Sequence, residues 1–113
     1  MESFPPQKIA EATRLLRAVA HELRLSTLCH LGDGPKTVSE LIALTGASQS
    51  NLSQHLAKMR MMGLVRCERR SQQMVYHLAD PAFAQIIAAL KNIYCQHPAA
   101  VAPDASPSQR SLS

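Results

Sequence analysis

The residues of this chain best suited to chemistry are its three cysteines and one basic stretch. Cys29, Cys67 and Cys95 are an odd number of thiols, which does not make the disulfide framework of a small secreted domain. The 113-residue chain begins without the basic and apolar regions of a signal peptide. It also lacks an apolar run of the ~18–20 residues that span a membrane. We therefore expect one cytoplasmic domain, in which thiol chemistry is reversible.

The basic stretch spans residues 48–70. It holds five lysines and arginines against the single acid Glu68, and so accounts for the whole net charge of +4. A basic stretch on an otherwise neutral domain is typical of a protein that binds nucleic acid. The same run of charge also suits a solvated face without a partner. The choice between these two interpretations depends on the elements that position the charges.

Those elements form the pattern of a winged helix-turn-helix, a mainly α fold with a small β-wing. Apolar residues at helical spacing predict a first helix over Ile9–Leu23, and a second segment spans Glu22–Leu31. The capping-box sequence Thr37–Glu40 starts a third helix, which ends at Gly46, and Ser48 caps a fourth. The third and fourth helices, joined by a short turn, are a helix-turn-helix.

The pattern changes after the fourth helix. Two β-prone runs, 64–68 and 74–78, flank the polar segment 69–73, which predicts a two-stranded hairpin, or wing. Asp80-Pro81 then begins a last helix. The apolar positions of that helix are Phe83, Ile86, Ile87, Leu90, Ile93 and Tyr94.

The terminal helices carry more apolar surface than a domain of this size covers by itself, so we expect a homodimer through them. The domain itself is predicted over residues 7–97. Residues 1–6 are expected to be flexible, and the Pro-, Ser- and Ala-rich segment 98–113 is expected to be a disordered tail.

The fourth helix is the predicted DNA reader. One side of this helix is expected to face the core through Leu52, Leu56 and Met59, which leaves small and amide side chains on the other side. Such side chains suit the major groove, where Gln pairs with adenine and Ser bonds to a base edge or a phosphate. The predicted contacts from this helix are Gln49, Ser50, Ser53, Gln54, His55 and Lys58. His55 lies on the flank, where it either contacts DNA or packs against its own domain. The wing contributes predicted backbone or minor-groove contacts from Arg69, Arg70, Gln72 and Gln73.

Four blocks of the sequence resemble the ArsR/SmtB family of bacterial winged-helix repressors. They are residues 23–29, 38–41, 50–56 (Ser-Asn-Leu-Ser-Gln-His-Leu) and 63–65 (Gly-Leu-Val). The resemblance covers residues 9–96. It implies a homodimer that binds double-stranded operator DNA, expected to be an imperfect palindrome, and that loses affinity when it is modified or binds a ligand.

Many members of this family sense metals, but their usual ligands are missing here. The third helix, 38–43, has no Cys-x-Cys pair, and the last helix has no histidine before His97. Cys29 and Cys95 instead resemble the thiol pair of the persulfide-sensing members. In that subfamily the two thiols join as a disulfide or through extra sulfur atoms, and transcription of sulfide-detoxification genes changes. The resemblance therefore implies a persulfide or polysulfide inducer, and no metal or cofactor is predicted.

Several alternatives stay open from the residues alone. The thiols of Cys29 and Cys95 are either a reactive pair, favoured as thiolates by Arg24, His30 or His97, or small inert core residues. Cys67 lies outside the pair and is predicted to be structural. A metal or haem sensor is the nearest rival, because Cys29, His30, Cys95 and His97 supply enough soft ligands. An enzyme is not predicted, since adjacent helical residues such as Cys29 and His30 point ~100° apart and no orienting group accompanies them.

Overall fold

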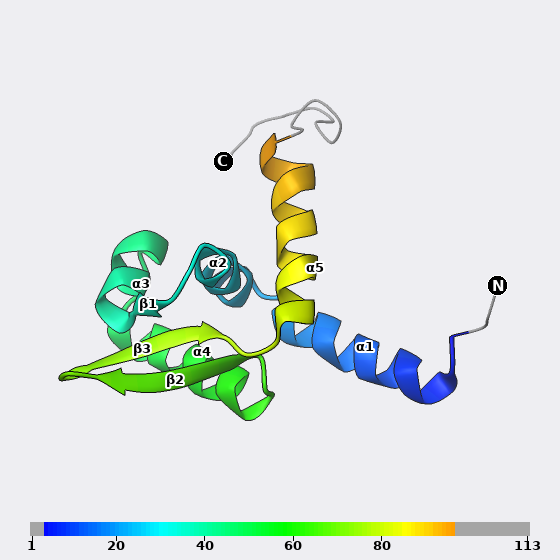
Figure 1. The fold of residues 1–113 in the computed structure, drawn as a ribbon, viewed down its shortest axis with the longest axis horizontal. Coiled ribbons are helices and arrows are strands. Elements are labelled where there is room, and N and C mark those ends of the chain that lie inside the picture. The colour runs from blue at the N-terminus through cyan, green and yellow to red at the C-terminus, as the bar shows by residue number, and fades with distance from the viewer. Residues whose placement is uncertain (1–3, 97–113) are drawn as a thin grey trace.

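The computed structural model describes residues 4–96 and confirms a mainly helical winged helix-turn-helix (Figure 1). In chain order its elements are α1 (Pro6–Val19), α2 (Glu22–Leu31), β1 (Lys36–Thr37), α3 (Val38–Thr45), α4 (Gln49–Met61), β2 (Val65–Arg70), β3 (Gln73–Leu78), α5 (Pro81–Lys91) and the π-helical turn η1 (Asn92–Gln96). The predicted tail, 98–113, lies outside the described residues, as do residues 1–3 and His97.

The first helix is shorter than the apolar pattern predicted. It ends at Val19, and Leu23 belongs to α2. The break occurs because His21 is extended, with φ −151° and ψ 130°, and its Nδ1 accepts the Leu23 N–H at 3.2 Å. A side-chain cap of this kind satisfies an orphan donor at the start of a helix, and so it favours a new helix over continuation of α1.

The helix-turn-helix forms as predicted, and local hydrogen bonds explain its geometry. The Thr37 hydroxyl accepts the Glu40 N–H at 3.1 Å, while the Glu40 carboxylate accepts the Thr37 N–H at 2.8 Å. Gly46 adopts the left-handed conformation (φ 76°) that ends α3, and the Ser48 hydroxyl caps α4 by accepting the Asn51 N–H. These contacts fix the orientation of α4 relative to α3.

The sheet has three strands in the order β1-β3-β2 and not two, because Lys36 and Thr37 pair with β3. The wing strands are also longer than predicted. The turn needs only Ser71 and Gln72, with Ser71 at φ 57°, so the predicted segment 69–73 is largely strand. Arg69, Arg70 and Gln73 therefore lie on paired strands and not in a free loop.

The core lies between α2, α3, α4 and the base of α5. Its fully buried side chains, at most 1% exposed, include Leu28, Leu41, Leu52, Leu56, Met59 and Ile87. Burial of each such side chain is worth about 1.5–3 kcal/mol, so the predicted inner stripe of α4 anchors that helix firmly. The opposite side of α4 is thereby held towards solvent.

The terminal helices extend away from this core (Figure 1). Asp80 caps α5 by accepting the Ala82 N–H, and Pro81 occupies its first turn, as predicted. Of the six predicted apolar positions of α5, Phe83 and Ile87 are buried, whereas Ile86, Ile93 and Tyr94 are exposed. Within residues 4–96, no helix is both long and apolar enough to cross a lipid bilayer.

Candidate nucleic-acid interface and thiol pair

The outer side of α4 presents an exposed polar surface. Ser50, Ser53, Gln54 and Lys58 are exposed, and Gln49 lies exposed in the first turn. These residues alternate with the buried stripe of Leu52 and Leu56, so the same periodicity produces both faces. The surface combines hydroxyl, amide and ammonium groups, which hydrogen-bond to base edges and phosphates.

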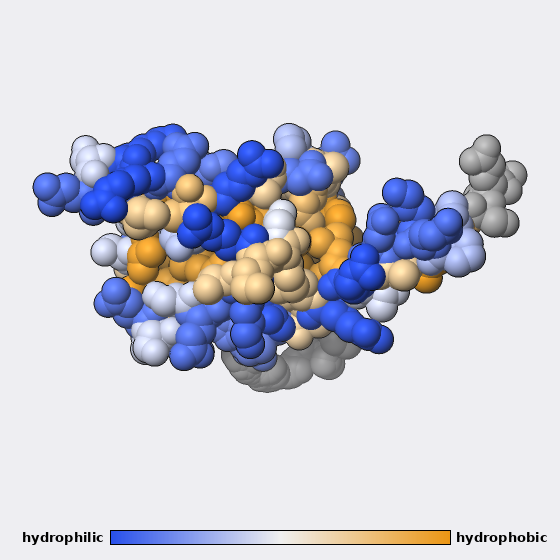
Figure 2. All heavy atoms as spheres, turned by 90° about the horizontal axis from the view of Figure 1, so that it is seen from below, coloured by the Kyte–Doolittle hydropathy of each residue, from blue (hydrophilic) through white to orange (hydrophobic). Residues whose placement is uncertain are grey.

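The wing lies beside this surface. A hollow of about 400 Å³ separates the two elements, and residues of both line it: Gln49 and Ser53 from α4, and Gln72 and Gln73 from the wing. The wing tip is covered by hydrophilic side chains (Figure 2). Four of the predicted DNA contacts, from segments more than 15 residues apart in the chain, therefore border one polar concavity.

The two arginines of the wing tip lie on opposite faces of the sheet. Arg69 pairs in register with Met74 and shares its face with Tyr76, and both of these residues line the hollow beside α4. Arg70 pairs with Gln73 on the other face, and Gln73 borders the hollow only at the wing tip. Successive side chains of a strand alternate between faces, so Arg69 shares the face of the recognition helix. The Arg70 guanidinium lies 3.2 Å from the Glu68 carboxylate, which neutralises part of its charge. Arg69 is thus the better-placed free cation of the wing.

His55 differs from the other predicted contacts because it packs against its own domain. Its ring lies 4.4 Å from that of His21, and its Nδ1 is buried without a hydrogen-bond partner among the described residues. Burial lowers the pKa of the His55 imidazole, and the neighbouring His21, Arg24 and Lys58 lower it further. Of the two roles left open for this residue, the geometry favours the packing role.

Cys29 and Cys95 lie on neighbouring elements, because α2 packs against α5 and α5 continues into η1. Cys29 is half-buried in α2, and Cys95 is exposed in η1. Burial raises the pKa of the Cys29 thiol. Lys91 opposes this rise, whereas the negative charges of Cys95 and Asp33 add to it. The charge of Cys95 is thus one of the influences on the Cys29 thiol.

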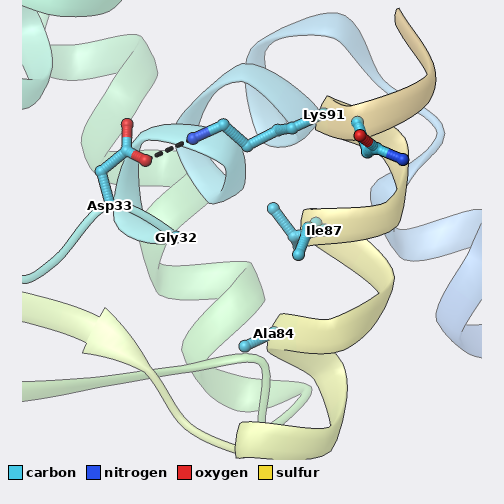
Figure 3. A pocket seen from close by; sticks show the side chains of 7 residues that line it. Gly32, Asp33, Ala84, Ile87 and Lys91 are labelled. Atoms are coloured by element: carbon cyan, nitrogen blue, oxygen red, sulfur yellow. Dashed lines mark hydrogen bonds and ion pairs between the residues drawn. The ribbon is translucent and has the colours of Figure 1, made fainter. Parts of the chain in front are cut away.

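The cation beside Cys29 is not one of those expected. Lys91 lowers the pKa of Cys29, whereas Arg24 lies near His55, and the net pKa of Cys29 is raised and not lowered. Lys91 forms an ion pair with Asp33, which lies just after α2 (Figure 3). Sequence reasoning missed this pair. No local signal in the sequence marks this pair, because the two residues are 58 positions apart.

Cys67 lies apart from the pair, on the wing. It pairs in register with Tyr76 and is half-buried between the exposed Arg66 and Glu68, which resolves its inward orientation. Burial raises the pKa of the Tyr76 hydroxyl, and the adjacent Cys67 adds to the effect. Among residues 4–96, no three His, Cys, Asp or Glu side chains are grouped closely enough to hold a metal ion.

Comparison with known proteins places this geometry in a family. Residues 21–66 match the family described as bacterial regulatory protein, arsR family. The chain is 45% identical over 86 residues to the HTH-type transcriptional regulator YgaV of Escherichia coli, covering 75% of this chain and 87% of YgaV. It is 42% identical over 87 residues to the transcriptional activator HlyU of Vibrio cholerae, covering 77% of this chain and 81% of HlyU.

Solved structures agree with the sequence comparison. Reduced HlyU from Vibrio cholerae superposes with a TM-score of 0.77 at 41% identity, over 80% of this chain and 95% of HlyU. The transcriptional repressor BigR of Xylella fastidiosa gives 0.74 at 35% identity, over 79% of this chain and 91% of BigR. These relatives are regulators of transcription, in agreement with the prediction that the chain is not an enzyme.

Proposed function

Because this chain belongs to the ArsR family of bacterial regulatory proteins, and so is a DNA-binding regulator of transcription, we propose that it is a dimeric repressor whose operator affinity is switched by a Cys29–Cys95 link. The observation that carries the proposal is the joint presence of a polar surface on the outer side of α4 and two free cysteines away from it, one in α2 and one in η1 at the end of α5. A change at the thiols would then alter the position of the reading surface without touching it.

Operator reading is assigned to the exposed side of α4. Gln54 and Ser53 would contact base edges in the major groove, while Lys58 and the wing would contact phosphates. Truncation of Gln54 or Ser53 to alanine should therefore lower the preference for the operator over unrelated duplex. A gel-shift titration with both duplexes measures this preference. Unchanged preference in both variants would refute the assignment.

The dimer is supported by apolar surface that one protomer leaves uncovered. Ile9 and Leu16 of α1 are 47% and 58% exposed, and Ile93 and Tyr94 at the end of α5 are 41% and 63% exposed. Apolar side chains also gather across the middle of the face between the wing and α1 (Figure 2). A hollow of about 360 Å³ is lined by Leu15 and Ala18 of α1 together with Met62 and Leu64. A second copy of the chain would cover these surfaces. Two reading heads would then meet half-sites about one helical turn apart in an imperfect palindrome.

The proposed switch is a two-step thiol reaction. The Cys29 thiolate attacks the outer sulfur of a persulfide donor RSSH, forms Cys29–S–SH and releases the thiol RSH. The Cys95 thiolate then attacks the Cys29 sulfur, forms the disulfide and releases hydrogen sulfide. If a second RSSH first converts Cys95 to Cys95–S–SH and releases RSH, attack of its terminal sulfur on the Cys29 sulfur releases hydrogen sulfide and leaves one extra sulfur atom in the bridge. Reduced HlyU, one of the similar solved structures, is a form defined by its redox state.

The switch is tested with the two single-cysteine variants. Cys29→Ser and Cys95→Ser should each bind operator DNA and ignore a persulfide donor that releases the native protein. Intact mass spectrometry of the treated native protein should show loss of two hydrogens, with or without added sulfur, and peptide mapping should join Cys29 to Cys95. If both variants still leave the operator on treatment, the thiol switch is wrong and a metal or haem ligand becomes the better account.

A further inference from the structure

The end of α2 packs closely against α5. A Cβ on Gly32 would lie 3.2 Å from Ile87 Cγ2, so the Gly32 backbone packs directly against the Ile87 side chain and leaves little room for a larger residue. One turn further along α5, Lys91 pairs with Asp33 across this contact, joining residues 58 apart in sequence (Figure 3). Gly32, Asp33, Ile87 and Lys91 all line one shallow pocket.

The ion pair and the thiol pair occupy matching positions. Asp33 follows Cys29 by four residues, and Lys91 precedes Cys95 by four. Lys91 is the last residue of α5, and Cys95 follows it by about one turn in η1, which continues α5. The same Gly32 Cβ would also lie 3.2 Å from the carbonyl oxygen of Cys29, so the last turn of α2 that carries Cys29 borders the contact with Ile87. Lys91, one turn beyond Ile87 and paired with Asp33, thus lies at the end of α2 that carries both Asp33 and Cys29.

Asp33 and Cys29 differ in how strongly each depends on the positive charge of Lys91. Asp33 is exposed and has other cations within range, since Lys36 and His30 also lower its pKa after the dominant hydrogen bond and charge of Lys91. Cys29 is half-buried, and Lys91 is the cation that counters the effect of burial on its pKa. Solvent and other cations therefore stabilise the Asp33 carboxylate when Lys91 moves away. A half-buried Cys29 thiolate depends more strongly on the positive charge of Lys91.

We propose that Lys91 is a positioning residue of the thiol pair, whose ammonium group pairs with Asp33 while Cys29 is a thiol and moves to the Cys29 sulfur when the thiolate forms. Asp33 then acts as a competitor that holds the thiol less reactive. Formation of the Cys29–Cys95 link removes the thiolate charge and returns Lys91 to Asp33. This regulatory consequence rests on the proposed thiol switch, but the effect of Lys91 on Cys29 does not.

The test measures alkylation of Cys29 by iodoacetamide in a Cys67→Ser, Cys95→Ser background, in which Cys29 is the only thiol. The rate is followed against pH, so that the pKa and the intrinsic reactivity are separated. Lys91→Met should raise the pKa of Cys29 and slow alkylation several-fold at neutral pH. Asp33→Asn should act in the opposite direction, lowering the pKa and accelerating alkylation several-fold. Lys91→Arg keeps the charge and should restore most of the native rate.

The opposite changes expected in the alkylation rate of the two variants distinguish an electrostatic role of Lys91 from a purely structural one. Both Lys91→Met and Asp33→Asn break the same ion pair, so a mere clasp between α2 and α5 would change the alkylation rate in one direction in both variants. Shifts of one sign, or no shift in pKa, would overturn the proposal. Lys8→Met and Glu11→Gln, which break an exposed ion pair on α1, are the matched controls and should leave Cys29 unchanged. Thermal unfolding of each variant checks that the fold is retained.

This experiment uses neither DNA nor an inducer. Failure of the Lys91 proposal therefore leaves the thiol switch standing, and a failed switch in the operator assay leaves the Lys91 result standing. The alkylation assay tests the Lys91 proposal, and the operator-binding assay tests the thiol switch.

Discussion

Replacement of Arg69 by alanine tests how the wing meets DNA. Arg69 is exposed on the face of the sheet that borders the hollow beside α4, and it lacks an acidic partner among residues 4–96. If it neutralises one phosphate, a dimer loses two phosphate contacts in the variant. Each such contact contributes about 0.9 to the slope of log affinity against log salt, so the slope should become shallower by about 1.8.

That change in slope is large enough to measure as a change in affinity. Between about 50 and 200 mM salt, a difference of about 1.8 in slope changes the ratio of native to variant affinity about twelvefold. The loss should be the same for the operator and for unrelated duplex, because phosphate contacts carry no sequence information. Fluorescence anisotropy over a salt series, with both duplexes, measures the slope and its sequence dependence.

Arg70→Ala is the matched comparison on the neighbouring residue. The Arg70→Ala substitution should weaken binding to all duplexes alike. Because Glu68 already neutralises part of the charge of Arg70, this substitution should change the salt slope less than Arg69→Ala does. Lys8→Ala on α1 should not change the slope. A slope for Arg69→Ala equal to that of the native protein would show that this arginine does not approach the backbone, and the placement of the wing on DNA would be wrong.

Three further predictions concern stability and the remaining thiol. Gly46→Ala should destabilise the protein by about 1–2 kcal/mol in urea unfolding, because φ is 76° and no atom lies within 4 Å of the new Cβ, so only backbone strain contributes. An unchanged midpoint would mean that the turn relaxes. Cys67→Ser should retain both operator binding and the response to a persulfide donor, and loss of the response in a folded variant would place Cys67 in the sensor. The pKa of His55 is lower in the folded protein than in the unfolded chain, so as pH decreases the unfolded chain takes up a proton on His55 before the folded protein does. Stability should fall as pH decreases from about 6.5, the ordinary value for the unfolded residue, by at most about 1.4 kcal/mol per pH unit from this group. His55→Gln should flatten that dependence in unfolding measured from pH 7.5 to 5, and an equal slope in the two proteins would contradict the assignment.

Local chemistry made the helix-turn-helix predictable. The capping box at Thr37 and Glu40, the glycine at position 46 and the inner stripe of α4 each act within one or two helical turns. The end of α1 was not predictable in the same way, because it depends on a histidine cap at His21, and histidine is an uncommon capping residue. The turn of the wing gave no glycine signal, since Ser71 itself adopts the positive φ.

Contacts between distant segments explain the rest of what the sequence did not reveal. Strand β1 has two residues, too few for a β pattern, and exists because β3 pairs with it. In the candidate site, exposure of the α4 residues followed from periodicity, but the packing of His55 on His21 and the pairing of Lys91 with Asp33 join segments far apart in the chain. Local patterns contain no information on such neighbours.

The strand order β1-β3-β2 leaves β2 at an edge of the sheet, with one row of backbone groups free to pair with another chain. Unprotected edges of this kind promote aggregation, and natural proteins guard them with charged side chains. Along β2 the exposed residues are Arg66, Glu68, Arg69 and Arg70, all of them charged. Substitutions that neutralise these arginines to weaken DNA binding therefore also remove a barrier against edge-to-edge association. Arg69→Glu, which keeps the edge charged while reversing its sign, separates loss of DNA affinity from loss of solubility.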